Sequence, residues 1–420
     1  LLGQVVGPGQ AAVPEAAIGP GLEVEKHVHA GQGYAQTVDL EHRQGAVEEL
    51  LVVCDERRRA VQAALVAAVE DQVDLLGEGL DIGQEGDLGA ANAEMIIDCD
   101  GATVTPGLFD SHCHVVLGDY TPRQKQTGFL ESEVHGGVTT FISAGEVHLP
   151  GRPKDPVGAK ALAILAAKSF ANFRPGGGKV VGGALILEKG LVKADFEELA
   201  KEGVRTVGEI RLGTIKNPED AAPMVKWAKE CGMTVMMHTG GTSIPGSSTV
   251  TAEMVIQANP DIASHINGGP TAVAMDEVKR LVTETDLTLE IVHCGNPKTA
   301  VEAANLCVEQ NALDRIIIGN DAPSGTGVVP LGVLRVICHL ASLTAIKPEE
   351  AICMATGNTA RVHKLPRGVI AEGKEADLTI MDAPMGSVGE DALSAIEAGD
   401  VPAVAMVLVD GEVVVSKSRN

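Results

Sequence analysis

The sequence predicts an α/β protein: a (β/α)8 TIM-type barrel with a small, incomplete β-sandwich domain. From Met95 onward, apolar runs rich in β-branched residues alternate with amphipathic helical stretches, the pattern of βα units around a parallel sheet. This part covers about 240 residues, close to the roughly 250 typical of such a barrel. Histidines and carboxylates recur where the apolar runs end, which is where a barrel places its functional residues.

Eight apolar runs are expected to form the barrel strands. They are residues 104–114, 139–144, 180–186, 205–209, 234–238, 262–266, 288–292 and 315–319. Helical spacing of apolar residues predicts helices at residues 126–135, 158–172, 194–202, 221–230, 275–285, 299–310, 331–343 and 348–357.

The last part of the chain returns to strand-like alternation. Residues 368–381 and 405–416 read as strands, and Asp410-Gly411 is a hairpin turn signal. We therefore expect the barrel at residues 104–359 and the small β-sandwich domain at residues 94–103 together with 360–420.

Residues 1–93 look unlike the rest. They contain no Met, Phe or Trp, their acidic residues outnumber the basic ones by about three to one, and only residues 48–76 show a spacing close to helical. Two explanations stay open: an acidic, partly helical or disordered extension, or a mistranslated stretch joined to the genuine protein near Met95. We favour the second.

Composition narrows the function classes. The formal charge of −24 argues against nucleic acid and anionic membranes as partners. The sequence has no signal-peptide pattern and no apolar run long enough to span a bilayer. Its eight Cys are scattered without a CxxC pair, which favours reduced, buried thiols and a cytoplasmic location.

The strongest chemical signal is a pair of histidines at the end of the first barrel run. Since side chains in a strand alternate with a period of two, His112 and His114 point the same way and can bind one metal ion. Other predicted strands end in Glu209, His238, His265 and Asp321. The ends of all barrel strands meet at one face, so the set predicts a two-metal hydrolytic site. Glu209 is the expected bridge, because two cations close together need an anion between them.

Each of these residues has an alternative role. His238 and His265 are the kind of histidine that often sits satisfied in a core, Asp321 suits a loop or helix N-cap, and Glu209 suits a surface salt bridge. Their common position at strand ends favours the metal site.

Taken together, the histidine pair after Pro-Gly-Leu-Phe-Asp, the later single histidines and the last aspartate resemble the amidohydrolase superfamily. Within it, long segments resemble the branch that hydrolyses a cyclic enamide in bacterial nicotinate breakdown. These segments are residues 118–125, 150–155, 213–224, 238–252, 264–272 and 319–327. The chain departs from the superfamily in residues 1–93, where relatives place several sandwich strands.

The resemblance implies a ligand set and a reaction. His112, His114 and Asp321 would bind one metal, His238 and His265 the other, and Glu209 would bridge them in place of the carboxylated Lys of many relatives. The two divalent metals would be zinc and iron. A metal-bridging hydroxide would attack, with Asp321 as general acid/base, to convert 6-oxo-1,4,5,6-tetrahydronicotinate to 2-formylglutarate and ammonia.

A substrate that carries a carboxylate also needs a cation. The candidates for substrate binding are Arg123, Arg152, Lys154 and Lys216, with Asn267 and His293 as further contacts. A small-molecule partner and a homo-oligomer are expected. Two other functions stay open: a different cyclic amidase or deaminase, such as a hydantoinase or a dihydroorotase-like enzyme, and a non-catalytic binding protein of the same fold.

Overall fold

The structure is a computed structural model. It describes residues 50–53, 95–99, 101–115, 117, 126–147, 149, 151–241, 249–268, 273–323, 327–371 and 373–416. The prediction for Arg123, and those for residues 1–49 and 54–94, lie outside the described residues.

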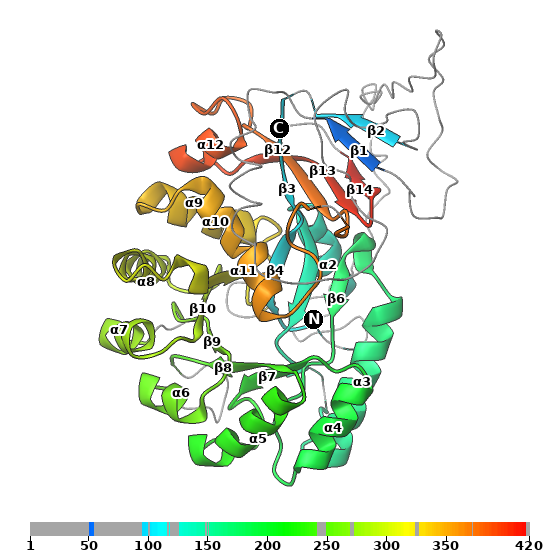
Figure 1. The fold of residues 1–420 in the computed structure, drawn as a ribbon, viewed down its shortest axis with the longest axis vertical. Helices are drawn as coiled ribbons and strands as arrows, with labels where there is room; N and C mark the ends of the chain where they lie inside the picture. The colour runs from blue at the N-terminus through cyan, green and yellow to red at the C-terminus, as the bar shows by residue number, and fades with distance from the viewer. Residues whose placement is uncertain are drawn as a thin grey trace, which may run out of the picture.

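Eight parallel strands form the barrel in the described part of the chain (Figure 1). They are β4 (Leu108–Cys113), β5 (Val138–Ser143), β6 (Lys179–Val181), β7 (Thr206–Ile210), β8 (Thr234–His238), β9 (Ile262–Ser264), β10 (Thr288–Val292) and β11 (Ile316–Gly319). They pair in chain order as β4-β5-β6 and β7-β8-β9-β10-β11. Parallel bridges between Leu185 and Val207 and between Cys113 and Ala322 join the two groups. The fold class is therefore confirmed, and each of the eight predicted runs contains a barrel strand, although several strands are shorter than predicted.

Helices cover the outside of the strands (Figure 1). The predicted ones are found as α2 (Gln126–Val134), α3 (Pro156–Asn172), α4 (Lys193–Lys201), α5 (Pro218–Glu230), α7 (Met275–Glu284), α8 (Pro297–Glu309), α9 (Gly332–Leu343) and α10 (Pro348–Met354). Sequence reasoning missed α6 (Ala252–Ala258), α11 (Gly357–Val362) and α12 (Ala392–Ala398), because one or two turns are too short to show a helical period. Among the described helices, none has the length and apolar character to cross a bilayer.

The predicted first strand, residues 104–114, is wrong as a single element. Strand β3 (Thr103–Pro106) pairs with β12 (Leu378–Asp382) in the small sheet, and β4 begins at Leu108 in the barrel. Gly107 lies between them and donates its N–H to the carbonyl of Asp377, at 2.7 Å. The apolar pattern runs on without interruption, so only the pairing partners reveal the break.

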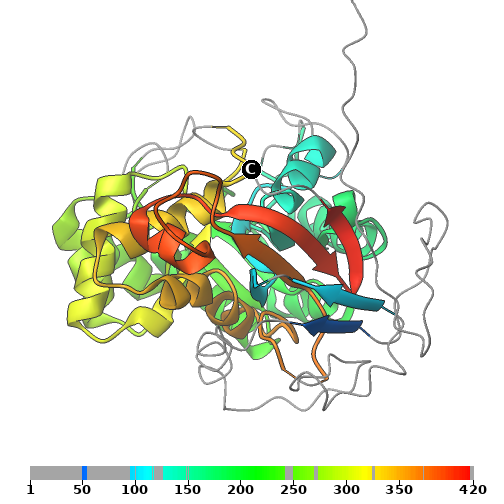
Figure 2. The ribbon, with the colours of Figure 1, turned by 90° about the horizontal axis from the view of Figure 1, so that it is seen from above.

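Two small sheets lie side by side at one end of the barrel (Figures 1 and 2). One is antiparallel in the order β14-β13-β12-β3, with β13 (Ala403–Val409) and β14 (Glu412–Ser416). The other pairs β1 (Leu50–Val53) in parallel with β2 (Met95–Asp98), so the helical spacing noted for residues 48–76 is wrong at least over β1. Ile97 packs into one apolar cluster with Ile380 and Leu408.

Two elements of the small sheet differ in how well the sequence predicted them. The hairpin turn at Asp410 and Gly411 is confirmed, and both residues have positive φ, 51° and 78°. In contrast, the predicted strand at residues 368–381 is a strand only from Leu378 onward.

Lys179, on β6, joins the barrel to the small sheet. Its ammonium group lies 2.5 Å from a carboxylate oxygen of Glu375, 2.8 Å from Asp377 and 2.5 Å from Asp410. The Lys179 side chain is only 6% exposed, so these carboxylates supply the charge that a buried ammonium group requires.

Candidate metal centre

Six polar side chains meet at the mouth of the barrel, where the strands reach their carboxyl ends. Each is at most 4% exposed. They are His112 in β4 and His114 just after it, Glu209 in β7, His238 in β8, His265 one residue after β9 and Asp321 two residues after β11. The structure brings together all six residues that the sequence predicts as ligands.

The carboxylate of Glu209 lies between two groups of these side chains. Its Oε2 faces the β4 histidines, 3.6 Å from His112 Nε2 and 3.4 Å from His114 Nε2. Its Oε1 faces the other pair, 3.4 Å from His238 Nδ1 and 2.6 Å from His265 Nε2. One oxygen for each group is the geometry of a bridging carboxylate.

Asp321 belongs to the β4 side of the cluster. Its Oδ1 lies 3.3 Å from His114 Nε2 and 3.7 Å from His112 Nε2. Its Oδ2 accepts a hydrogen bond from the thiol of Cys294, at 3.1 Å. Burial and the charge of Asp321 raise the pKa of Cys294, so the thiol keeps its proton and leaves Oδ1 facing the cluster.

Three of the four histidine rings are oriented by their outer nitrogens. Nδ1 of His112 is 2.7 Å from Glu290 Oε2, Nδ1 of His114 is 3.3 Å from the carbonyl of Gly145, and Nε2 of His238 is 3.1 Å from the carbonyl of Gly241. When the outer nitrogen donates, the inner one presents a lone pair. The inner nitrogen of His112 is buried and has no hydrogen-bond partner among the described residues.

Glu290, on β10, is a supporting residue that sequence reasoning missed. Besides His112, it contacts the hydroxyl of Ser111 at 2.6 Å and the backbone N–H of His265 at 3.3 Å, and it is fully buried. The available signal was a carboxylate inside the apolar run Thr-Leu-Glu-Ile-Val, which is costly to bury without partners.

The backbone turns two of the ligands into the mouth. His265 and Asp321 have positive φ values of 35° and 58°, a region that non-glycine residues rarely adopt and that is often found at functional sites. Nearby, Oδ1 of Asp110 accepts the N–H groups of His112 and Asn320. This carboxylate therefore ties β4 to the end of β11 next to the ligands.

The charges in the cluster depend on one another. Burial alone would lower the pKa of His114, but hydrogen bonds and charge from Asp321 and Glu209 outweigh it and raise the pKa to about 9. Burial alone would raise the pKa of Asp321, yet the histidines hold it at about 2. The pKa of Glu209 lies well below its usual range for the same reason. Two ionised carboxylates in a buried site thus need positive charge, from imidazole protons or from bound cations.

These residues fit a pair of divalent metal ions. The donors are imidazole nitrogens and carboxylate oxygens, which suit divalent transition metals, and they form three overlapping groups of possible ligands around Glu209 and His112. A fourth acidic group, formed by Glu375, Asp377 and Asp410, holds the ammonium group of Lys179 instead.

The structure describes three of the four charged residues that the sequence predicts as substrate contacts. The guanidinium group of Arg152 is paired with Glu188 at 2.7 Å, Lys154 is exposed, and Lys216 donates to the carbonyl of Arg211 at 2.5 Å. All three lie in segments that follow β5 and β7, as expected from the sequence.

Asn267 and His293 are the two remaining candidates for substrate binding. The side-chain amide of Asn267 exchanges hydrogen bonds with the backbone of Val292, at 2.8 and 3.0 Å, and so extends the pairing of the neighbouring strands. The ring of His293 lies against Gly332 of α9, where Arg335 and His339 act on its pKa, which burial and these neighbours lower.

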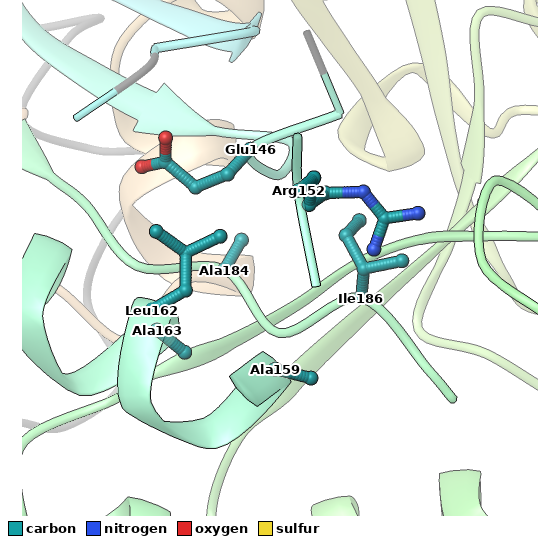
Figure 3. Close-up of a pocket in the computed structure, with 7 residues that line it drawn as sticks. All are labelled: Glu146, Arg152, Ala159, Leu162, Ala163, Ala184 and Ile186. Atoms are coloured by element: carbon teal, nitrogen blue, oxygen red, sulfur yellow. The ribbon is translucent and has the colours of Figure 1, made fainter. Parts of the chain in front are cut away.

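Glu146, just after β5, is a further buried carboxyl that the sequence did not suggest. Its Oε2 accepts the N–H of Leu117 at 2.6 Å, and burial raises its pKa to about 8. It lines a small hollow between α3 and the segment after β6, where its carboxyl and the guanidinium group of Arg152 point in opposite directions (Figure 3). With a volume of about 10 Å³, the hollow has room for one water molecule and not for a ring.

Comparison with known proteins gives consistent results. Residues 103–414 match the amidohydrolase family. The enamidase of Eubacterium barkeri is 62% identical over 339 residues, which are 81% of this chain and 88% of that protein. An adenine deaminase of Mesorhizobium japonicum is 28% identical over 303 residues, 68% of this chain and 46% of that protein.

Solved structures agree with these matches. The crystal structure of an enamidase has a TM-score of 0.78 at 62% identity and covers 81% of this chain and 88% of its own. A D-hydantoinase from Thermus sp., at 17% identity, has a TM-score of 0.56, covers 80% of this chain and 89% of its own, and shows the shared fold alone. The family match over most of the chain and the 62% identity to a relative show that this chain belongs to the amidohydrolase family.

Proposed function

We propose that the chain is a metal-dependent hydrolase that opens a cyclic enamide or lactam, with 6-oxo-1,4,5,6-tetrahydronicotinate as the substrate. Conversion to 2-formylglutarate and ammonia breaks both bonds of the ring nitrogen to carbon and consumes two water molecules. The observation that carries the proposal is the carboxylate of Glu209, which presents one oxygen to each of two ligand groups, in a chain 62% identical to a protein named enamidase.

The proposed ligand set follows these two groups. His112, His114 and Asp321 would hold one metal, His238 and His265 the other, and Glu209 would touch both. Zinc and iron are the metals we expect. When bound, two such cations lower the pKa of a shared water toward about 7 and polarise the carbonyl of the substrate.

The side chains of the protein perform the remaining tasks. Asp321 is ionised at neutral pH and turns Oδ1 into the cluster, so it can accept the proton of the attacking water and return it to the leaving nitrogen. Glu290 and Cys294 fix the His112 ring and the Asp321 carboxylate. Burial of the six side chains keeps bulk water from screening these interactions.

The test combines metal analysis with a substrate panel. We expect two transition metals per purified chain and release of ammonia from 6-oxo-1,4,5,6-tetrahydronicotinate, with little turnover of hydantoin, dihydroorotate or adenine. Efficient turnover of one of those three, and none of the tetrahydronicotinate lactam, would replace this proposal with another cyclic amidase or deaminase. A homo-oligomer remains a prediction that gel filtration with light scattering can check.

A further inference from the structure

A group of cations follows strands β5 and β7, the second of which carries Glu209. Lys216 and Arg211 follow β7, and Arg152 and Lys154 follow β5. Glu188 is the carboxylate among them, and it is already bound by Arg152 Nη1 at 2.7 Å and by the N–H of Thr214 at 3.0 Å. In the described part of the chain, Lys216 therefore interacts with three other cations and with the carboxylate of Glu188.

Arg211 is held in an unusual backbone conformation. Its φ is +86°, although it is not a glycine, and it lies two residues beyond Glu209. The residue is only 6% exposed, and its Nη1 lies 3.6 Å from the sulfur of Met254 on α6. Strain of this kind at a strand end usually serves a side chain that must be placed there. The guanidinium group thus reaches from the end of β7 to α6, the helix that follows β8.

Lys216 completes the arrangement. Its ammonium group donates to the backbone carbonyl of Arg211 at 2.5 Å, which is a neutral partner. Burial lowers the pKa of Lys216, and the charges of Arg211, Arg152 and Lys154 lower it further, against the opposing effect of Glu188. A partly buried ammonium group among other cations is costly unless an anion joins it.

The expected substrate carries two polar groups that face opposite ways. In 6-oxo-1,4,5,6-tetrahydronicotinate the carboxylate and the lactam carbonyl lie at opposite ends of one six-membered ring. We propose that Lys216 and Arg211 form the subsite that receives the substrate carboxylate and so direct the lactam toward Glu209 and its ligands. This inference rests on the proposed function and adds the residues that select an acidic substrate over a neutral one.

The experiment compares the acid with its carboxamide, a neutral analogue of the same shape. Lys216→Met is expected to lower kcat/KM for the acid by about 10- to 100-fold, mainly through KM, because a hydrogen bond between charged groups is lost. Turnover of the carboxamide should change by less than about 3-fold, and Lys216→Arg should restore most of the activity on the acid. Arg211→Gln should likewise lower kcat/KM for the acid and leave turnover of the carboxamide nearly unchanged.

Lys189→Met is the matched control. Lys189 is exposed, and in the described residues its backbone N–H donates to Thr214 Oγ1 of the same segment at 2.7 Å, so loss of its side chain should not alter turnover of either substrate. Metal content and Tm are measured for every variant. Equal losses on acid and carboxamide in a fully metallated Lys216→Met protein, or an equal effect of Lys189→Met, would overturn the subsite.

A binding measurement separates this inference from the proposed function. The aromatic acid 6-oxo-1,6-dihydronicotinate resists ring opening, and its Kd can be measured by calorimetry. If the wild type hydrolyses no lactam but Lys216→Met weakens this Kd by about 10-fold or more, the proposed function fails and the anion subsite stands. An unchanged Kd would refute the subsite whatever the turnover.

Discussion

Glu209 lies between two groups of histidines and gives each of them one oxygen. A glutamine in its place has the same shape but only one oxygen and no negative charge. We expect Glu209→Gln to retain less than one metal per chain and to lose kcat/KM by at least about 10³-fold, since both the bridge and the charge that offsets two cations are removed. Metal analysis by mass spectrometry checks this, and a variant that still holds two metals would place the bridge elsewhere.

Glu290 should act on the site through His112. Replacement by glutamine weakens the hydrogen bond that fixes the ring but leaves all six proposed ligands in place. We expect Glu290→Gln to lower metal affinity by about 10- to 100-fold, as is usual for carboxylates behind a metal-bound histidine. Competition with a chelator measures the affinity, and an unchanged value would reduce Glu290 to a packing role.

At the residue scale, the six clustered side chains were predictable because strand periodicity and strand ends can be read from sequence. His112 and His114 share a face by their spacing alone. Glu290, Cys294 and Glu146 were not predictable in the same way, since their roles depend on contacts between strands far apart in the chain. The contacts of Asn267 and His293 likewise became visible only with their neighbours in place.

Among the elements, the change of sheet between β3 and β4 depends on Gly107. A Cβ atom there would lie 2.2 Å from the Thr139 hydroxyl. We expect Gly107→Ala to lower the free energy of unfolding by about 1–3 kcal/mol through overpacking. Gly128→Ala is the control: Gly128 is in α2 with nothing within 4 Å of its would-be Cβ, so alanine should stabilise by about 0.5–1 kcal/mol. Urea unfolding compares the two, and equal effects would contradict the role of Gly107.

The end of α11 carries a pH-sensitive residue. His363 is 4% exposed, and burial lowers its pKa from 6.5 to about 4. Between about pH 6.5 and 4, His363 is therefore protonated in the unfolded chain and neutral in the folded chain. The free energy of unfolding falls as the pH drops through this range. The loss reaches about 3 kcal/mol near pH 4. His363→Phe should remove this part of the acid sensitivity, seen as a smaller loss of unfolding free energy between pH 7 and 4. Parallel pH curves for variant and wild type would show that His363 is not responsible.

Among the helices and strands, the long and regular ones could be predicted from the sequence, but the residues at which they begin and end could not. All eight barrel strands were found because each is a compact apolar run. The split of residues 104–114 was missed because β3 and β4 form one apolar run whose halves pair with different sheets. The short helices α6, α11 and α12 are fixed by packing rather than by their own period.

For the whole molecule, Lys179 connects the barrel to the small sheet. Lys179→Met would remove the ammonium group that three carboxylates share and leave them only Arg367 and Arg174 among their described partners, so we expect a loss of about 1–3 kcal/mol in unfolding free energy. Lys193→Met is the control, because the Lys193–Glu230 pair is exposed and should contribute nothing measurable. Guanidinium unfolding measures both, and equal stability of the two variants would rule out this role of Lys179.

The alternation of strands and helices in the sequence predicted the architecture of the whole molecule. It did not predict the ion pairs that connect the barrel to the small sheet. Lys179 reads in sequence as an ordinary charge at the start of a strand. Only the folded chain brings Glu375, Asp377 and Asp410 to it from some 200 residues away.

The barrel closes where its ligands lie. The N–H of Asp321 bonds to the carbonyl of His112, and the N–H of His114 bonds to the carbonyl of Ala322, each at 2.7 Å. Ligands from the first and last barrel strands therefore come into register only when the ring of strands is complete, after a loop of about 200 residues has been closed. Metal uptake should then report the final step of folding. A chain that ends before β11 would keep five of the six side chains and still lack the scaffold to hold them.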